Sequence, residues 1–284
     1  MIIDFHVHTF PASVQQDRGP YLERDATFSA LYSNPRAQIA TADDLLRSMD
    51  AAGVDVSVMQ GFGWSDPGLC RRHNDDLLEA AARHPSRLIA FCTVQPASED
   101  AAPAEALRCL NAATPARGFG ELRPDDQGYS GRWRALGPLW QAVRSHGAPP
   151  LLVHASEPVG HRYPGKGAMT PEVLMGLAEA YPEWPMVLAH LGGGLPFYAA
   201  MPEVRNSLHN IWIDTAAWPL LYGPEVFMAL AATFGTERIL FGSDYPLQAQ
   251  DRSVERLRGV PLTPQEIAGV LGGNAARLLG LGGG

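Results

Sequence analysis

Eight short apolar segments separated by helical patterns are the feature that most restricts how this 284-residue chain can fold. Apolar strands that alternate with helices form parallel sheets buried on both faces. Eight such units predict a closed (β/α)8 TIM barrel of the α/β class, as one domain over residues 1–284. The expected strands cover residues 1–10, 54–60, 88–94, 116–122, 150–155, 185–191, 211–216 and 238–243. The expected helices cover residues 41–52, 69–84, 103–113, 133–146, 171–181, 196–208 and 224–234, with one or two more over 264–279.

The first of these strands ends in His6-Val7-His8. Side chains alternate between the two faces of a strand, so both imidazoles point the same way. Neutral imidazole nitrogen is a preferred ligand of zinc and of neighbouring transition metals. The pair therefore suggests a metal site, although a strand that ends in solvent would explain the same two residues.

Four more ligand-type residues end later strands. In a parallel barrel all these strand ends lie on the C-terminal face, where active sites are built. Six candidate ligands then converge on one place, which a structural role alone explains poorly, and we predict a metal centre there. The four additional residues are Glu121 after the fourth strand, His154 after the fifth, His190 after the sixth and Asp244 after the eighth.

Composition excludes several other classes of protein. The chain has 22 Lys and Arg against 30 Asp and Glu, a net charge of −8, with no long run of one sign. We therefore expect neither nucleic acid nor a membrane as partner. The three cysteines are widely spaced without a C-x-x-C pair, as in reduced core residues. There is no signal-peptide pattern and no apolar run of about 18 residues, so we expect a cytoplasmic protein.

The strand-end residues also carry a family resemblance. It is formed by His6-x-His8, His154 before Ser156-Glu157, His190 in Ala-His-Leu-Gly-Gly-Gly and Asp244 in Phe-Gly-Ser-Asp-Tyr-Pro. This ordered set resembles the amidohydrolase superfamily. It is more closely similar to the amidohydrolase-related branch that includes enzymes like aminocarboxymuconate-semialdehyde decarboxylase, as is the ending Gly-Asn-Ala-Ala-Arg-Leu-Leu-Gly-Leu. The resemblance spans the whole chain and implies a distorted (β/α)8 barrel with one or two divalent metals at its C-terminal mouth.

Matched position by position, the resemblance implies roles for these residues. His6 and His8 would bind the first metal. Asp244 would be a further ligand, or the carboxylate that takes a proton from metal-bound water. His154 and His190 would bind a second metal; alternatively, His154 binds the first metal and His190 polarises the substrate.

Glu121 bears on the number of metals. Many relatives carry a carboxylated lysine at this position that bridges two metals, and some use glutamate there. Glu121 therefore favours a binuclear site, while an ion pair with Arg123 is the alternative. We expect zinc, although manganese, iron and cobalt also suit imidazole and carboxylate ligands.

The implied activity is metal-dependent hydrolysis of a small amide, ester or lactone. Water activated by the metal would attack, and Asp244 would act as general base. Two alternatives stay open: a metal-dependent decarboxylase of an unsaturated or aromatic carboxylic acid, and a binding protein that keeps the barrel without catalysis. Homo-oligomerisation is also left open.

Loop residues provide candidate contacts to a small-molecule substrate. The long polar segment over residues 11–40 leaves directly from His8, as a lid or binding loop does. Cationic side chains suit a substrate carboxylate or phosphate, and aromatic side chains suit an apolar pocket wall. The candidates are Arg123, Arg162, Lys166, Trp64 and Tyr245.

Other polar residues have simpler expected roles. Asp4 either orients a ligand imidazole or accepts hydrogen bonds from backbone at the bottom of the barrel. His73, His84 and His209 lie in or beside predicted helices, and we expect them on the surface.

Overall fold

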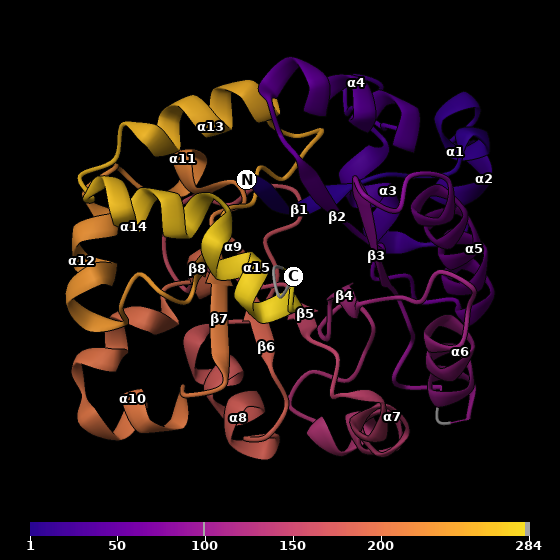
Figure 1. Cartoon of the computed structure of the whole chain (residues 1–284). Coiled ribbons are helices and arrows are strands. Elements are labelled where there is room, and N and C mark those ends of the chain that lie inside the picture. The colour runs from indigo at the N-terminus through magenta and orange to yellow at the C-terminus, as the bar shows by residue number, and fades with distance from the viewer. Residues whose placement is uncertain (99, 282–284) are drawn as a thin grey trace.

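A parallel eight-stranded barrel forms the centre of the computed structural model, which describes residues 1–98 and 100–281 (Figure 1). Each strand pairs with the next one along the chain, so the strand order is β1 to β8. The predicted (β/α)8 fold is confirmed. The strands are β1 (Ile3–His8), β2 (Val56–Gln60), β3 (Leu88–Cys92), β4 (Gly118–Leu122), β5 (Leu151–Val153), β6 (Met186–Leu188), β7 (Ile211–Asp214) and β8 (Ile239–Leu240).

The barrel closes where the segment that follows β8 runs beside β1. Phe5 N donates to Phe241 O at 2.7 Å, and Asp244 N donates to His6 O at 2.9 Å. His8 N donates to Tyr245 O at 2.7 Å. These bonds leave no open sheet edge at β1 and hold Asp244 beside the two histidines of β1.

Helices surround the barrel (Figure 1). They include α4 (Ala42–Ala52), α5 (Pro67–Arg83), α6 (Ala101–Leu110), α7 (Gly137–Val143), α8 (Pro171–Ala180), α10 (Pro202–Ser207), α12 (Val226–Thr233), α13 (Gln250–Arg258), α14 (Pro264–Ala268) and α15 (Asn274–Leu279). Short helices within connections are α1 (Ala12–Gln16), α2 (Gly19–Leu22), α3 (Ala26–Tyr32), α9 (Ala189–Gly192) and α11 (Trp218–Leu221). The 3-10 helices are η1 (Trp133–Leu136), η2 (Arg144–His146) and η3 (Leu195–Ala200), and η4 (Gly269–Gly273) is a π-helix.

Helix α4 shows how local sequence sets these elements. Thr41 accepts from Asp44 N while the Asp44 side chain accepts from Thr41 N, which is a capping box at the helix start. Gly53 ends the helix at φ 68°, a conformation that favours glycine. Both ends agree with the prediction from sequence.

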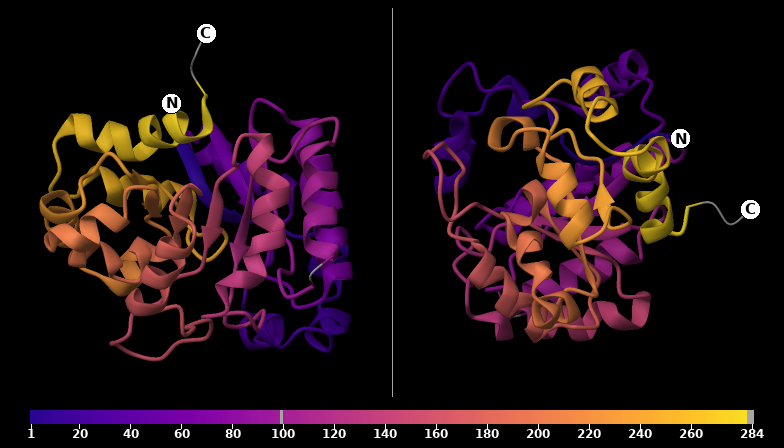
Figure 2. Two further views of the ribbon diagram at one scale, coloured as in Figure 1. Left: turned by 90° about the horizontal axis from the view of Figure 1, so that it is seen from below. Right: turned by 90° about the vertical axis from the view of Figure 1, so that its left-hand side faces the viewer.

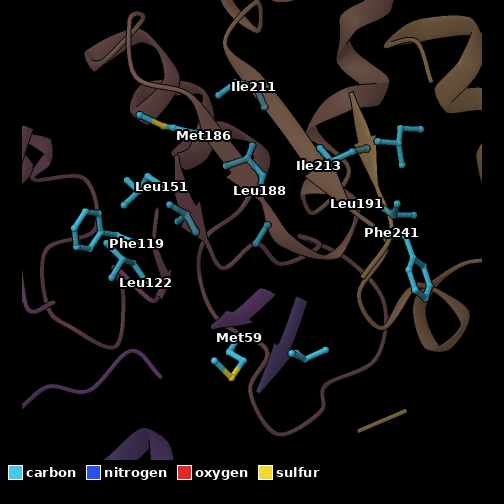
Figure 3. Packing of buried hydrophobic residues seen from close by; sticks show 14 of the residues in the cluster. Met59, Phe119, Leu122, Leu151, Met186, Leu188, Leu191, Ile211, Ile213 and Phe241 are labelled. Atoms are coloured by element: carbon cyan, nitrogen blue, oxygen red, sulfur yellow. The ribbon is translucent and has the colours of Figure 1, made fainter. Parts of the chain in front are cut away.

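The core lies between the barrel and its helices, and the strands are buried on both faces. Figure 3 shows part of it, with Leu188 from β6, Ile213 from β7 and Phe241 from the residue directly after β8. A second cluster inside the barrel includes Phe5, Phe91 and residues of α15. Helix α15 packs on β1 and β8 at the end where the chain begins (Figure 2).

Several connections differ from the predictions; helix α13, for example, was not predicted. The segment expected as an irregular loop over residues 11–40 contains α1, α2 and α3. It packs an aromatic cluster that includes Phe10, Phe28, Phe62 and Trp64. The single helix expected over residues 196–208 is divided into η3 and α10, because Met201 between them is extended. Among the described residues, no helix is both long and apolar enough to cross a membrane.

Candidate metal centre

The strand-end residues predicted as ligands meet at the C-terminal mouth of the barrel. They form two groups, and within each group one potential ligand atom per residue lies within 4.8 Å of the others. None is more than 9% exposed. One group is His6, His8 and Asp244, and the other is Glu121, His154 and His190.

His6 and His8 direct their Nε2 atoms at each other across 3.0 Å. His6 Nδ1 lies 2.7 Å from Asp214 Oδ2, and because a carboxylate only accepts, Nδ1 carries the hydrogen. In the neutral ring, His6 Nε2 therefore presents a lone pair to His8. Two nitrogen atoms at this separation can both lie ~2.1 Å from one ion such as zinc, so the pair fits a divalent cation.

The charges around this pair also fit a cation. Burial lowers the pKa of His6, but Asp214, Glu121 and Asp244 outweigh burial and raise that pKa to about 10. Burial and the charge on His6 lower the pKa of His8 to about 4, which keeps its imidazole neutral as a ligand must be. The cluster thus favours one positive charge between the two rings. A divalent ion with imidazole and carboxylate ligands meets the same demand.

Glu121 belongs to the second group of candidate ligands and also approaches the first. Its Oε1 is 2.8 Å from His154 Nδ1 and 3.6 Å from His190 Nε2, and its Oε2 is 3.6 Å from His8 Nε2. Burial raises the pKa of Glu121, but the neighbouring histidines outweigh burial and hold it well below the ordinary value. Glu121 is therefore an ionised carboxylate within reach of both groups.

Arg123 uses its charge within the protein. Among the described residues, its ion pair is with Asp126 at 2.6 Å and not with Glu121, the alternative considered from sequence. Its Nη2 donates to Gly165 O at 2.7 Å, and its Nη1 lies 3.0 Å from His154 Nδ1. The charge of Arg123 is thus paired with Asp126 inside the protein.

The backbone at His190 and Asp244 is left-handed, with φ of 55° and 63°. His190 N donates to Asp214 Oδ1 at 3.0 Å, and its Nδ1 lies 3.1 Å from Ala216 O, so Nε2 faces Glu121. Burial lowers the pKa of His190, but Glu121 and Asp244 outweigh burial and raise that pKa to about 9. At neutral pH this charge distribution favours an imidazolium, which can donate a proton.

Asp4 does not contact a ligand imidazole. Its carboxylate accepts from Ser243 N at 2.9 Å, Ser243 Oγ at 2.6 Å, Gln250 Nε2 at 2.8 Å and His6 N at 3.3 Å. Burial raises the pKa of Asp4 to about 6, against the opposing effect of these hydrogen bonds. Of the two roles considered from sequence, Asp4 has the backbone role, and it joins β1 to the segment before Asp244.

Asp214 is a residue of the centre that the sequence reasoning missed. It ends β7, is fully buried and bonds both the His6 ring and the His190 backbone. The signal was present, because Ile211-Trp212-Ile213-Asp214 is an apolar strand that ends in a carboxylate. The same rule had selected Glu121 and Asp244.

A cavity of about 490 Å³ opens from the ligand cluster. Its inner end is formed by His8, Glu121, His154, His190 and Asp244, with Arg123 beside them. The outer walls come mainly from α3, α11 and the loops after β2, β5 and β8. Apolar side chains predominate there, among them Leu31, Phe62, Leu220, Leu221 and Leu247.

Of the residues expected to contact a substrate, only Arg123 is in the lining of this cavity. Lys166 instead donates to Val159 O at 2.5 Å and to His161 O at 3.2 Å. Trp64 is buried in the aromatic cluster below α3, and Tyr245 packs against the core. Arg162 is on the same exposed loop as Lys166, outside the lining formed by the described residues. Tyr32 and Phe62, which sequence reasoning did not select, line the cavity instead.

Comparison with known families agrees with this architecture. A family model described as amidohydrolase matches residues 3–281. The chain belongs to the amidohydrolase family. The resemblance stated from the strand-end residues is thereby confirmed.

Curated relatives from this family are decarboxylases. Gamma-resorcylate decarboxylase of Rhizobium radiobacter is 24% identical over 293 aligned positions, which cover 85% of this chain and 88% of the relative. This finding overturns the expected hydrolysis of an amide, ester or lactone. The ligand motifs could not distinguish the two reactions, because water activation and decarboxylation use similar histidine and carboxylate ligands at the same barrel mouth.

Solved structures with the same fold include two decarboxylases. The 5-carboxyvanillate decarboxylase of Sphingomonas paucimobilis has a TM-score of 0.76 at 18% identity, with 99% of each chain covered. A dihydroxybenzoic acid decarboxylase of Polaromonas was solved with manganese and the inhibitor 2-nitroresorcinol. It has a TM-score of 0.73 at 20% identity, with 99% of this chain and 97% of that chain covered. This chain is thus an enzyme of the amidohydrolase superfamily with ligands for a divalent metal.

Proposed function

We propose that this amidohydrolase-family chain is a divalent-metal-dependent decarboxylase of hydroxylated aromatic carboxylic acids. The observation that carries the proposal is the position of His190. Its Nε2 faces Glu121 at the inner end of the cavity, beside the group formed by His6, His8 and Asp244. The activity named for the curated relatives supports the same reaction.

His6, His8 and Asp244 would hold the metal, with His154 and Glu121 next to them. When bound, a divalent ion supplies fixed positive charge for the carboxylate and hydroxyl oxygens of the substrate. Manganese is the metal in one solved relative and suits these ligands as well as zinc does. A decarboxylase does not need two bridged ions, so we propose one metal, with Glu121 as an ionised neighbour that keeps His190 protonated.

His190 would supply the proton that replaces carbon dioxide. Its imidazolium donates a proton from Nε2 to the ring carbon that bears the carboxylate, and the carbon–carboxylate bond then breaks to leave the phenol and carbon dioxide. His190 recovers its proton from solvent after product release. Burial lowers the pKa of His190, but Glu121 and Asp244 outweigh burial and raise that pKa to about 9. The charged form is therefore favoured before the reaction.

The first test is carbon dioxide release from 2,6-dihydroxybenzoate by manganese-loaded protein. We expect turnover that chelation abolishes. His190→Gln should lower kcat by roughly 100-fold or more, since positioned proton donors contribute about that factor. His146→Gln, on an exposed histidine of η2, is the matched control and should leave kcat unchanged.

Two results would contradict the proposal. One is a folded, metal-loaded protein that releases no carbon dioxide from any hydroxybenzoate. The other is full activity in His190→Gln, which would remove the proposed proton donor while leaving the metal site in place.

A further inference from the structure

The cavity wall outside the ligand cluster lacks a free cation among the residues the structure describes. Arg123 is the one arginine or lysine in this lining, and it is only 4% exposed. Its Nε donates to Asp126 Oδ2 at 2.6 Å and its Nη2 donates to Gly165 O, while its Nη1 lies 3.0 Å from His154 Nδ1. The charge of Arg123 is therefore already balanced by Asp126, and this lining offers a second anionic group on a substrate no other guanidinium or ammonium.

The wall is instead apolar on several sides. Leu31 comes from α3, Phe62 from the loop after β2, Leu220 and Leu221 from α11, and Leu247 from the loop after β8. These side chains offer dispersion contacts to an aromatic ring and no hydrogen bonds. A carboxylate placed against them would lose hydration without compensation.

The polar groups of the outer wall do not compensate a carboxylate for this loss of hydration. The Tyr163 hydroxyl donates to Glu157 Oε2 at 3.2 Å, so its partner at that part of the wall is an acidic side chain and not a cation. Tyr32 brings a phenol from α3. His161 lies on the exposed loop beside Tyr163, with ring centroids 5.5 Å apart. These groups suit the hydroxyl of a phenol better than a second carboxylate.

We infer that the substrate is an aromatic acid with a single carboxylate, whose ring away from that carboxylate carries only hydroxyl or small apolar substituents. This inference rests on the proposed function. It separates the acids named for the relatives, because gamma-resorcylate has one carboxylate and 5-carboxyvanillate has two. The structure assigns this chain to the first kind.

The test compares three substrates on manganese-loaded wild type: 2,6-dihydroxybenzoate, its 4-methyl derivative and 5-carboxyvanillate. We expect kcat/KM for the two monocarboxylates to exceed that for the dicarboxylate by roughly tenfold or more, because the wall leaves the second carboxylate unpaired. The 4-methyl group should be accepted with little loss. Dicarboxylate turnover equal to or faster than monocarboxylate turnover overturns the inference.

A designed variant tests the cause. Leu220 lines the cavity and is 54% exposed, so it can be replaced without disturbing the core. Leu220→Arg should improve kcat/KM for 5-carboxyvanillate several-fold, mainly through KM, by pairing the second carboxylate. Leu220→Gln, of similar length but neutral, is the matched control and should not improve kcat/KM for 5-carboxyvanillate.

His161→Ala should keep the monocarboxylate preference. Loss of the preference in this variant would assign the preference to His161 and overturn the role of the apolar wall.

Binding separates this inference from the proposed function. Two inert compounds allow binding to be measured without catalysis. In 2-nitroresorcinol a nitro group replaces the carboxylate of 2,6-dihydroxybenzoate, and in 4-hydroxy-3-methoxy-5-nitrobenzoate it replaces one carboxylate of 5-carboxyvanillate. Titration calorimetry compares the affinity of the protein for the two compounds. Tighter binding of 2-nitroresorcinol with no turnover of any acid would support the cavity inference and contradict the decarboxylase. Tighter binding of the nitrobenzoate, or binding of neither compound, would overturn the inference even if 2,6-dihydroxybenzoate is turned over. Carbon dioxide release from 2,6-dihydroxybenzoate alone decides the proposed function.

Discussion

Asp214 holds two histidines of the metal centre at once, through different oxygens. Oδ2 bonds the His6 ring and Oδ1 bonds the backbone of His190 and of Ala216. Burial raises the pKa of Asp214, but His6 and His190 outweigh burial and lower it. One ionised carboxylate thereby sets the tautomer of His6, a proposed metal ligand, and the position of His190, the proposed proton donor. A hydrogen bond that fixes the tautomer and orientation of a metal-binding imidazole commonly increases its affinity for the metal.

Asp214→Asn should weaken manganese binding by roughly 10- to 100-fold, because one amide cannot accept from both His6 and His190. Titration calorimetry of the metal-free protein measures this loss, and circular dichroism checks that the fold is kept. Asp251→Asn, an exposed aspartate in the first turn of α13, is the control. Unchanged manganese affinity in Asp214→Asn would show that His6 needs no such partner.

At the scale of single elements, the turn after β6 depends on glycine. Residues 190–194 all have positive φ. A Cβ at Gly193 would lie 2.7 Å from the carbonyl oxygen of Ser156, closer than real side chains allow. The glycines of the Ala-His-Leu-Gly-Gly-Gly motif are therefore needed for the left-handed backbone of this turn, in addition to the histidine that the motif provides. It lets His190 turn into the cavity immediately after its strand.

Helix α5 contributes a buried histidine to the aromatic cluster, which corrects the expectation that His73 is on the surface. His73 is 2% exposed, and its Nε2 donates to Thr9 O at 2.7 Å. Its Nδ1 accepts from Trp64 Nε1 at 3.1 Å, and its ring stacks on Phe10. The helical spacing shows that position 73 is on a helix, but only packing shows that this face meets the segment over residues 11–40.

Burial lowers the pKa of His73 to about 4, below the ordinary value of 6.5. The unfolded chain therefore binds a proton that the folded chain excludes between these two values. This contribution to stability is complete above pH 6.5 and is lost as pH falls toward 4, by up to about 3 kcal/mol.

Urea denaturation of metal-free protein at several pH values tests this linkage. The wild type should lose more stability than His73→Gln between pH 6.5 and pH 4.5. His209→Gln, at an exposed position, should follow the wild type. Parallel pH profiles for wild type and His73→Gln would contradict the assignment.

At the scale of the whole molecule, Asp4 connects barrel closure to the metal centre. It joins β1 to Ser243, the residue before Asp244, and to Gln250 at the start of α13. The first and last strands are far apart in sequence, so their pairing must be secured by contacts of this kind.

Asp4→Ala should reduce the free energy of unfolding by about 3 kcal/mol or more, because buried donors on Ser243 and Gln250 lose their acceptor. Asp4→Asn, which keeps one acceptor oxygen, should lose less. Urea denaturation measures both variants. A loss of less than about 1 kcal/mol for Asp4→Ala would show that backbone pairing alone closes the barrel.

The sequence by itself determined the barrel and the six ligand-type residues of its mouth. Strand and helix periods are local properties, and parallel strands carry residues such as His6, Glu121 and Asp244 to one end whatever the loops do. The reaction could not be decided in this way, because hydrolases and decarboxylases of the family share these ligands.

Only the tertiary structure decided what surrounds the ligands. It paired His6 with Asp214 and turned Lys166 toward its own loop. It also brought Tyr32 and Leu220 together on the cavity wall. Each of these contacts joins residues whose side-chain directions depend on how loops and helices pack. Periodicity therefore predicted where the chemistry lies, while packing determines which substrate the cavity accepts.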